Sequence, residues 1–327
     1  MSSLAILAKL AILVNKKKYS MLNYPMSHLV IVDGHAVIHR AYHSIPPLTR
    51  NGQPVNALYG FYSMLLSAID VLKPSHLVVC LDSPGPVSRS QEFIGYRAKR
   101  KPAEANLLVQ LPLLPETLKT ANIPSIAIGG FEADDLIATV TKKYTKKIKK
   151  ITIITGDKDL MQLVTDKINL FVPVRGLSET KIFGPAEVQD KLGVPPSLVV
   201  DLKALMGDMS DNYPGVAGIG PKTATELLDK YSSLDSIYHH LDEIKSSIKE
   251  KLTSDKSNAY LSQKLAKLID NIPLKFRLKS SRLNDDIYSG LQTLFTDYGF
   301  KSLASRLAKK SPQKPTVKVQ SNQASLF

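Results

Sequence analysis

The chain has 327 residues and is 43% hydrophobic, enough to fill the core of one large domain or of two smaller ones. It carries 43 Lys and Arg against 29 Asp and Glu, a formal net charge of +14. This charge favours nucleic acid over an anionic membrane as a partner, because no basic amphipathic helix with an aromatic face accompanies it. The single cysteine, Cys80 in the apolar run LVVCLD, excludes disulfides and predicts a small core residue in a reducing cytoplasm.

Residues 1–27 are predicted to be a dispensable extension. Their apolar stretch, residues 4–14, is interrupted by a lysine and is too short to span a bilayer. A signal peptide would carry its positive charge before the apolar stretch, whereas here three lysines follow it. We therefore expect the true start at Met21 or Met26.

From residue 29 the chain alternates between apolar runs and helical patterns. The runs LVIVD, LVVCLD, SIAIGG and ITIIT read as buried strands at residues 29–33, 77–82, 125–130 and 151–155. This alternation predicts an α/β fold with a central, mostly parallel sheet flanked by helices over residues 28–195. In such sheets the active cleft lies beyond the carboxyl ends of the strands, where Asp33, Asp82 and Asp157 stand.

Nine carboxylates fall in five short clusters. They are Asp33 in VDG, Asp82 in CLDSPG, Glu132, Asp134 and Asp135 in GFEADD, Asp157 and Asp159 in GDKD, and Asp208 and Asp211 in GDMSD. Glu132 and Asp135 are three residues apart at a predicted helix start, so they share one face of that helix. So many anions in one cleft would repel one another unless divalent cations neutralised them. On a basic chain, this pattern is typical of a metal-dependent enzyme that acts on nucleic acid.

After about residue 196, helical patterns and glycine-rich turns replace the strands. We expect a smaller helical domain over residues 196–307 and a flexible tail over residues 308–327. In GVAGIGPKTA, Gly218 and Gly220 allow a tight turn with free N–H groups before a helix that begins near Lys222. A helix start of this kind is a candidate phosphate-binding site.

Taken in order, the motifs VDG, GQPVNALYGF, GFEADD, GDKDLMQL, GDMSDNYPGV and GIGPKTA resemble the 5′-nuclease family over residues 29–307. This family includes the 5′-3′ exonuclease domain of bacterial DNA polymerase I, stand-alone bacterial 5′-3′ exonucleases and flap endonucleases. The resemblance implies a PIN-like 5′-nuclease fold, with a helical arch at about residues 83–115 above the active site. It also implies a helix-hairpin-helix that grips duplex DNA through Gly218, Gly220, Lys222 and Thr223. Because only about twenty residues follow the matched region, we expect a stand-alone nuclease.

The resemblance further implies two Mg²⁺ ions, which Mn²⁺ can replace, and a K⁺ ion as a candidate at the hairpin. The first ion would be held by Asp33, Asp82, Glu132, Asp134 and Asp135, and the second by Asp157, Asp159, Asp208 and Asp211. Carboxylates suit Mg²⁺ as ligands. One ion would generate hydroxide and the other would stabilise the leaving oxygen.

The arch segment VSRSQEFIGYRAKR departs from the family pattern. Arg89, Tyr96 and Arg100 match the family and are expected to contribute to catalysis, whereas Ser88 and Ser90 replace an aromatic residue and a histidine. Arg97, also a catalytic candidate, stands where the family has a lysine. An arginine keeps the charge but presents a planar fork instead of a compact ammonium, so the two are not equivalent near a reacting phosphate.

The sequence therefore predicts a cytoplasmic 5′-3′ exonuclease, flap endonuclease or both, acting on DNA in replication and repair. A catalytically weak DNA-structure-binding module of the same fold is the alternative, and it is disfavoured because all nine acidic positions are filled. An RNA-directed nuclease of the wider metal-nuclease fold is disfavoured because such proteins usually lack the GIGPKTA hairpin.

Three other features have plainer interpretations. GDMSDN lacks the glycine and glutamate spacing of a calcium-binding loop. His35, His39 and His43 recur every four residues, but no cysteine or nearby acidic residue completes a zinc site. The lysine run at residues 142–150 is more typical of a solvated helix end before a strand than of a DNA contact.

The last five residues, QASLF, resemble the short peptide through which bacterial replication and repair proteins bind the sliding clamp. Gln323, Leu326 and Phe327 match that peptide, whereas Ala324 replaces its usual leucine. The alternative is that two apolar residues stand at a frayed chain end by chance. The bacterial sliding clamp is thus a candidate partner.

Overall fold

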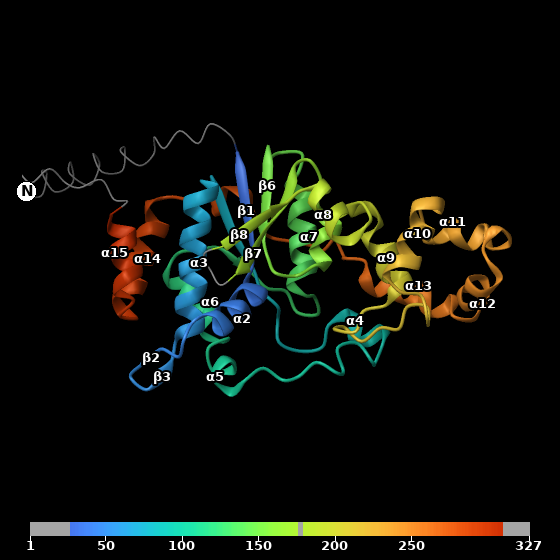
Figure 1. The fold of residues 1–327 in the computed structure, drawn as a ribbon. Coiled ribbons are helices and arrows are strands. Elements are labelled where there is room, and N and C mark those ends of the chain that lie inside the picture. The colour runs from blue at the N-terminus through green and yellow to red at the C-terminus, as the bar shows by residue number, and fades with distance from the viewer. Residues whose placement is uncertain (1–26, 176–178, 310–327) are drawn as a thin grey trace, which may run out of the picture.

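A central sheet of six strands organises the fold (Figure 1). The computed structural model describes residues 27–175 and 179–309, so the predicted N-terminal extension and C-terminal tail lie almost entirely outside the described residues. The sheet order is β5-β4-β1-β6-β7-β8. The strands are β1 (His28–Asp33), β4 (His76–Cys80), β5 (Ser125–Ile126), β6 (Lys150–Ile154), β7 (Ile168–Arg175) and β8 (Glu179–Phe183). All neighbours pair in parallel except β7 and β8, which confirms the predicted mostly parallel sheet.

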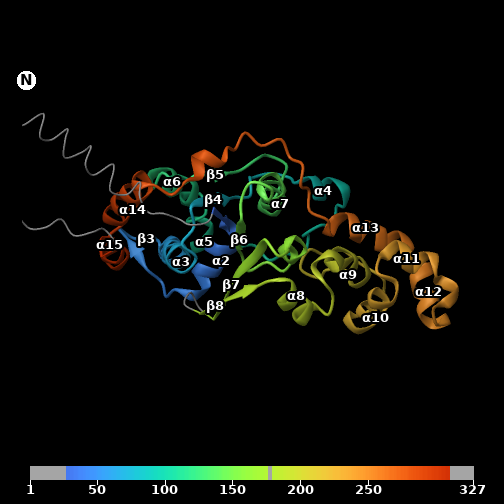
Figure 2. The same ribbon diagram turned by 90° about the horizontal axis from the view of Figure 1, so that it is seen from above.

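β1 is buried along its whole length because helices cover both faces of the sheet. Leu29 and Ile31 belong to the core formed with α7 (Ala133–Tyr144). Val30 and Val32 belong to the opposite core, formed with α2 (Gly34–Ser44) and α3 (Asn56–Leu72). Successive side chains of a strand point to opposite faces, so an uninterrupted apolar run requires two apolar layers. Figures 1 and 2 show α3 and α7 on opposite sides of the sheet.

The step from β1 into α2 depends on Gly34. A Cβ atom at this position would lie 2.4 Å from Cδ2 of Leu81 and 3.0 Å from the carbonyl oxygen of Cys80. Glycine therefore lets the ends of β1 and β4 come close together. This close approach brings Asp33, which precedes Gly34, near Asp82, which follows Leu81.

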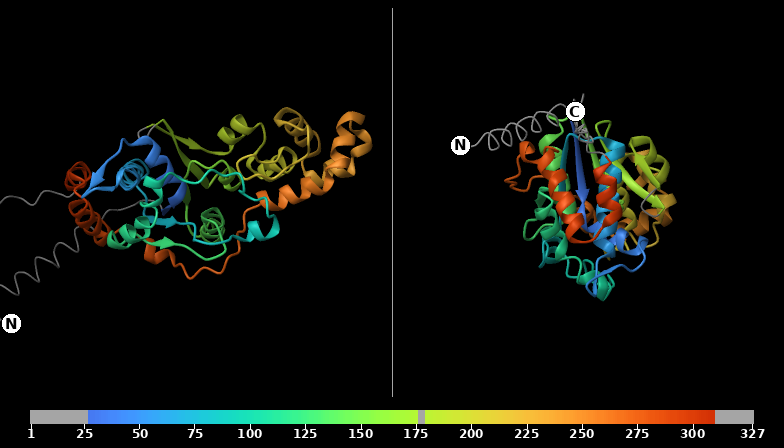
Figure 3. Two further views of the ribbon diagram at one scale, coloured as in Figure 1. Left: turned by 90° about the horizontal axis from the view of Figure 1, so that it is seen from below. Right: turned by 90° about the vertical axis from the view of Figure 1, so that its left-hand side faces the viewer.

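The arch segment between β4 and α6 (Leu113–Thr120) is mostly irregular. Its only regular elements in the described part of the chain are α4 (Ser88–Glu92) and α5 (Ala105–Leu108). A fuller helix was expected here, but Pro86, Gly95 and Pro102 interrupt helical hydrogen bonding along the segment. Seen from below, the segment runs along the molecule and places α4 beside α13 (Lys256–Ala266) (Figure 3, left).

A helical region projects from one end of the molecule (Figure 1). Its elements are η2 (Pro196–Leu198), α9 (Val199–Met206), α10 (Pro221–Tyr231), α11 (Leu234–His239), η3 (Leu241–Glu243), α12 (Ser246–Ser254) and α13, and α8 (Pro185–Leu192) connects β8 to this region. The remaining short elements are η1 (Asp159–Leu163), η4 (Leu278–Ser281) and the hairpin of β2 (Thr49–Arg50) and β3 (Gln53–Pro54). No helix of the described residues is both long and apolar enough to cross a membrane.

The last two helices do not belong to this projecting region. α14 (Asp285–Asp297) and α15 (Lys301–Ala308) return to the opposite end, beside α3 (Figures 1 and 2). Phe295 of α14 packs edge-on against Tyr62 of α3, with ring centroids 5.7 Å apart. The helical domain expected over residues 196–307 therefore ends before α14, because the apolar faces of α14 and α15 complete the α/β core.

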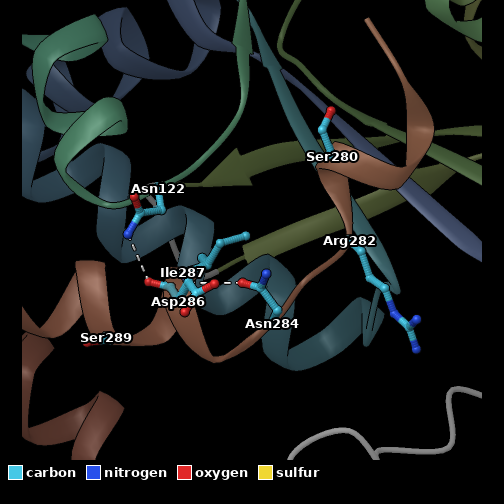
Figure 4. A pocket seen from close by; sticks show the side chains of 7 residues that line it. All are labelled: Asn122, Ser280, Arg282, Asn284, Asp286, Ile287 and Ser289. Atoms are coloured by element: carbon cyan, nitrogen blue, oxygen red, sulfur yellow. Dashed lines mark hydrogen bonds between the residues drawn. The ribbon is translucent and has the colours of Figure 1, made fainter. Parts of the chain in front are cut away.

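A polar cavity of about 380 Å³ marks the place where α14 joins the α/β core (Figure 4). The side chain of Asn122 donates to the carbonyl oxygen of Asp286 at 3.1 Å, and Asn284 accepts from the N–H of Ile287 at 3.2 Å. Arg282 extends away from these side chains (Figure 4). None of the predicted site residues lines this cavity, which is a structural junction.

Candidate active site

Four of the predicted carboxylates line one cavity of about 360 Å³ at the carboxyl edge of the sheet. Asp33 ends β1, Asp82 follows β4 and Asp157 follows β6. These strands are neighbours in the sheet, so their ends meet. Asp134 joins them from the first turn of α7. The other charged or titratable residues that line the cavity are His35, His39, Arg97, Arg100 and Lys101.

Backbone and hydroxyl donors hold the first two carboxylates in place. Asp33 caps α2 by accepting from the N–H of Ala36 at 3.0 Å, and it also accepts from Oγ1 of Thr155 at 2.8 Å. Asp82 accepts from the N–H of Ala133, at the start of α7, at 2.7 Å. These bonds fix the carboxylates at the sheet edge before any ligand binds.

Burial and mutual repulsion raise the pKa of two carboxyl groups in this cavity. Burial raises the pKa of Asp33 to about 7, and the neighbouring charges of Asp157 and Asp82 act in the same direction. Burial, followed by the charges of Asp33 and Asp157, raises the pKa of Asp134 well above its ordinary value. Carboxylates that are costly to ionise together are stabilised by a divalent cation, and an all-oxygen donor set suits Mg²⁺ or Mn²⁺.

The other five predicted carboxylates form ion pairs with basic side chains. Glu132 and Asp135 pair with Arg89, Glu132 and Asp211 with Arg97, Asp211 with Arg100, and Asp159 and Asp208 with Lys203. Over residues 27–175 and 179–309, no three His, Cys, Asp or Glu side chains are grouped so that they could hold a metal ion. For these five carboxylates the ion pairs give a physical reason, since arginine and lysine groups occupy the space among them.

Arg89 is buried and uses all its donors inside the protein. Its Nη1 and Nη2 atoms donate to the two oxygens of Asp135 at 2.8 and 2.7 Å, and Nη1 lies 2.7 Å from Oε2 of Glu132. Nε and Nη2 donate to the carbonyl oxygens of Leu265 and Lys267 at 2.8 and 3.0 Å. A guanidinium has five N–H donors, so none is left for a substrate phosphate. The same contacts explain why Asp135 turns away from the cavity.

Tyr96 and two arginines reach Asp211 from the arch segment. The Tyr96 hydroxyl lies 3.0 Å from Oδ2 of Asp211 and 3.0 Å from Oε2 of Glu132. Nε of Arg97 and Nη2 of Arg100 lie 3.1 and 3.3 Å from Oδ1 of Asp211. Arg97 also has a φ of +56°, a conformation that few residues with a side chain adopt. The arch is thus fastened to the acidic loop that contains Asp211.

Lys203 of α9 is a site residue that the sequence analysis missed. It forms an ion pair with Asp159, and its Nζ lies 2.7 Å from Oδ2 of Asp208. Although burial acts to raise the pKa of Asp208, Lys203 and hydrogen bonds from Ser210 and the Asp211 N–H lower that pKa to about 2. The available signal was a single lysine within the apolar helix VVDLKALM, five residues before Asp208.

The predicted phosphate-binding turn lies in the projecting helical region, just before α10 (Figure 1). Gly218 has a φ of +75°, and Gly220 is the N-cap of the helix. Lys222 and Thr223 occupy the first turn, where Lys222 is exposed. Gln323, Leu326 and Phe327, the predicted clamp-binding residues, lie outside the described residues.

Comparison with known proteins places both parts of the chain. One family model, described as the 5′-3′ exonuclease N-terminal resolvase-like domain, matches residues 28–193. A second, the 5′-3′ exonuclease C-terminal SAM fold, matches residues 194–287. The chain is 40% identical over 282 residues to DNA polymerase I of Caldicellulosiruptor bescii. The aligned region covers 85% of this chain and 33% of that protein. The chain therefore spans about a third of the length of the DNA polymerase I relatives it matches.

A second relative matches along its whole length. The chain is 34% identical over 303 residues to a 5′-3′ exonuclease of Aquifex aeolicus, covering 92% of this chain and 100% of that protein. Among solved structures, T5 5′-exonuclease with bound zinc ions superimposes with a TM-score of 0.63 at 20% identity, over 86% of this chain and 98% of that one. Human GEN1 in complex with Holliday junction DNA gives 0.55 at 13% identity, over 86% and 70%. These structures share the fold of this chain.

Proposed function

The chain belongs to the 5′-3′ exonuclease family, and on this premise we propose that it hydrolyses phosphodiester bonds near the 5′ end of a DNA strand. It acts as an exonuclease, a flap endonuclease or both, and releases products with 5′-phosphate and 3′-hydroxyl ends. The observation that carries this proposal is the meeting of Asp33, Asp82, Asp134 and Asp157 in one cavity next to the basic arch segment.

The four cavity carboxylates would hold a divalent cation, Mg²⁺ or Mn²⁺, by drawing closer together around it than they stand in the described residues. When bound, this ion supplies a Lewis acid and lowers the pKa of a water molecule that can attack the phosphodiester. The other predicted ligands now form ion pairs with arginine or lysine, so they would complete a second ion site only if the cation displaced those basic side chains. These ligands are Glu132, Asp135, Asp159, Asp208 and Asp211.

The arch residues divide into two roles. Arg97, Arg100 and Lys101 line the cavity, where their charges bind the scissile phosphate and stabilise the charge that develops on it. Arg89 and Tyr96 are positioning residues, because both are buried and bind the acidic side chains. The chain thus separates phosphate binding from support of the site.

The projecting helical region binds duplex DNA. Its turn presents Gly218, Gly220, Lys222 and Thr223 at the start of α10, where free N–H groups and a lysine charge suit a phosphate. The DNA complex of GEN1 supports DNA as the partner. The DNA polymerase I relatives support a role in replication and repair, and the buried thiol of Cys80 fits work in the cytoplasm.

A cleavage assay tests this function. A duplex with a 5′-labelled flap is incubated with the protein in Mg²⁺ and in EDTA, and the products are sized. Cleavage in Mg²⁺ that stops in EDTA supports the nuclease. Tight binding of the flap without cleavage in Mg²⁺ or Mn²⁺ would favour the alternative, a DNA-structure-binding module. Equal cleavage in EDTA contradicts the metal-dependent mechanism.

The C-terminal QASLF docks on the bacterial sliding clamp. Leu326 and Phe327 suit an apolar groove, and Gln323 suits a polar rim, as in peptide recognition by short extended segments. Such peptides bind with micromolar-range affinity, because ordering offsets part of the contact energy. Titration of the clamp with the full chain and with a version ending at Asn322 tests this, and equal affinities contradict it.

A further inference from the structure

Helices α12 and α13 hold the phosphate-binding turn at three points. The N–H of Gly215 donates to Oγ of Ser262 at 3.0 Å. The N–H of Ala217 donates to Oδ2 of Asp255 at 2.7 Å. The carbonyl oxygen of Gly218 accepts from Nζ of Lys251 at 3.0 Å. The turn is therefore fastened to a second helical element from outside the hairpin itself.

The residues that hold the turn form one stripe. Lys251, Asp255, Asn258 and Ser262 follow one another at intervals of four, three and four residues, from the last turns of α12 through the junction at Asp255 into α13. Asn258 donates to Oδ1 of Asp255 at 3.0 Å and so orients the carboxylate toward the turn. Asp255 lies between α12 and α13, which makes the two helices act as one support.

Gly218 is shaped for the approach of Lys251. Its φ of +75° is a conformation that glycine adopts at no steric cost. A Cβ atom there would lie 3.0 Å from Nζ and 3.2 Å from Cε of Lys251. The backbone conformation therefore favours glycine, and a Cβ atom would require the end of the lysine to shift by a few tenths of an ångström.

We propose that the ammonium group of Lys251 is the resident cation of this turn and replaces a free monovalent ion such as K⁺. A carbonyl oxygen carries partial negative charge, which is unfavourable beside a DNA phosphate unless a cation neutralises it. Lys251 supplies that cation covalently and adds one positive charge next to the phosphate-binding turn. Lys251 is thus a positioning residue for DNA binding. This inference rests on the proposed function, since it requires the hairpin to bind DNA.

The test compares DNA affinity in different monovalent salts. Binding of a 5′-flap duplex is measured by fluorescence anisotropy with EDTA present throughout. The measurement is made separately in KCl, NaCl and tetramethylammonium chloride at the same ionic strength. We expect the wild-type dissociation constant to agree within about twofold in the three salts. Lys251→Ala should bind about 5- to 10-fold more weakly in tetramethylammonium chloride, the effect of about one lost phosphate-proximal charge, and regain part of the loss in KCl. Lys251→Arg should behave as wild type.

Lys249→Ala is the matched control. Lys249 lies on the same helix, and its Nζ pairs with Asp242 at 2.6 Å instead of with the turn. This variant should bind equally in the three salts. Lys251→Met keeps the aliphatic stem, so it replaces Lys251→Ala if thermal unfolding shows that the alanine variant is destabilised.

Two results would overturn the inference. One is a wild-type protein that needs K⁺ for full affinity, and the other is a Lys251→Ala variant that matches Lys249→Ala in every salt. The Lys222→Ala variant distinguishes a wrong role for Lys251 from a failure of the proposed function. If Lys222→Ala weakens binding while Lys251→Ala does not, only the role of Lys251 is wrong. If neither variant weakens binding, the hairpin is not a DNA-binding element.

Discussion

Arg97 and Asp211 are joined twice, once through the backbone and once through the side chains. The N–H of Arg97 donates to the carbonyl oxygen of Asp211 at 2.9 Å, and Nε donates to its carboxylate at 3.1 Å. The two residues are more than a hundred positions apart, so the arch segment and the GDMSD loop are held as one unit. The charge of Arg97 is thereby placed at the cavity edge with little freedom to move.

Arg97→Ala should lower the single-turnover rate of flap cleavage on the order of 10²-fold, because a preorganised cation that stabilises developing phosphate charge is lost. Arg97→Lys should keep most of the rate or raise it, since the charge remains as a compact ammonium. Lys99→Ala, at an exposed position of the same segment, is the control and should cleave normally. An unchanged rate for Arg97→Ala would show that this position takes no part in the reaction.

Arg89→Met should destabilise the fold by about 3–5 kcal/mol, because it leaves Asp135 buried without its charge partner and removes one of the two arginines that pair with Glu132. Urea unfolding of the variant measures this loss. Arg100→Met removes an arginine that is half exposed, so its cost should stay below about 1 kcal/mol. Equal unfolding midpoints for the two variants would contradict the structural role of Arg89.

The pKa of Asp33 predicts how stability depends on pH. Its folded-state pKa of about 7 lies above the ordinary value, so the folded protein binds this proton more tightly than the unfolded chain does. The favourable contribution is complete below about pH 4 and is lost as the pH rises to about 7. Without divalent cations, Asp33→Asn should therefore gain in melting temperature relative to wild type over this range.

Thermal unfolding in EDTA between pH 4 and 8 checks this prediction. The quantity to follow is the difference in melting temperature between Asp33→Asn and wild type at each pH. Asp190→Asn, at an exposed position of α8, should run parallel to wild type at every pH. Adding Mg²⁺ should raise the melting temperature of wild type more at pH 8 than at pH 5. If the Asp33→Asn and wild-type curves also run parallel, the raised pKa is wrong.

Asp134→Ala and Asp157→Ala should each reduce turnover by orders of magnitude, because a lost ligand misplaces the reacting groups. Both should also weaken the binding of Mn²⁺, which electron paramagnetic resonance reports without any need for turnover. Asp190→Asn again serves as the control for surface charge. Normal Mn²⁺ affinity in both cavity variants would remove these carboxylates from the ion site.

Lys222→Ala should weaken duplex binding and reduce the salt dependence of the binding constant by about one unit of slope, as expected for one lost phosphate contact. Single-turnover cleavage at saturating enzyme should remain nearly intact, since Lys222 lies in the projecting region and does not line the cavity. Lys230→Ala, near the other end of α10, is the control. An unchanged slope would exclude Lys222 from the DNA interface.

The strand ends were predictable from the sequence because local patterns determine them. An uninterrupted apolar run, a parallel sheet and an acid at or just after the last position of the run together place Asp33, Asp82 and Asp157 at one edge. The partners of the acids were not predictable in this way. Arg89 donates hydrogen bonds to Asp135 and Leu265, which are 46 and 176 residues away in the sequence. The periodicity of a sequence does not predict contacts over such separations.

The return of α14 and α15 also has no local signal. Their amphipathic patterns predict helices, but an apolar helix face does not say which core it will cover. The structure pairs Phe295 with Tyr62 and Arg306 with Asp70, at 2.8 Å between Nη2 and Oδ2. These long-range contacts correct the predicted extent of the helical domain.

This return sets an order of events during protein synthesis. The sheet and its carboxylates leave the ribosome well before α14 and α15, which close the layer over α3. About 125 residues separate the end of β8 from the end of the second of these helices, and translation at 5–20 residues per second takes roughly 6–25 s to add them. Throughout that interval the nascent α/β core exposes an apolar face. The unfinished α/β core is therefore exposed to aggregation until α14 and α15 have been made and have packed beside α3.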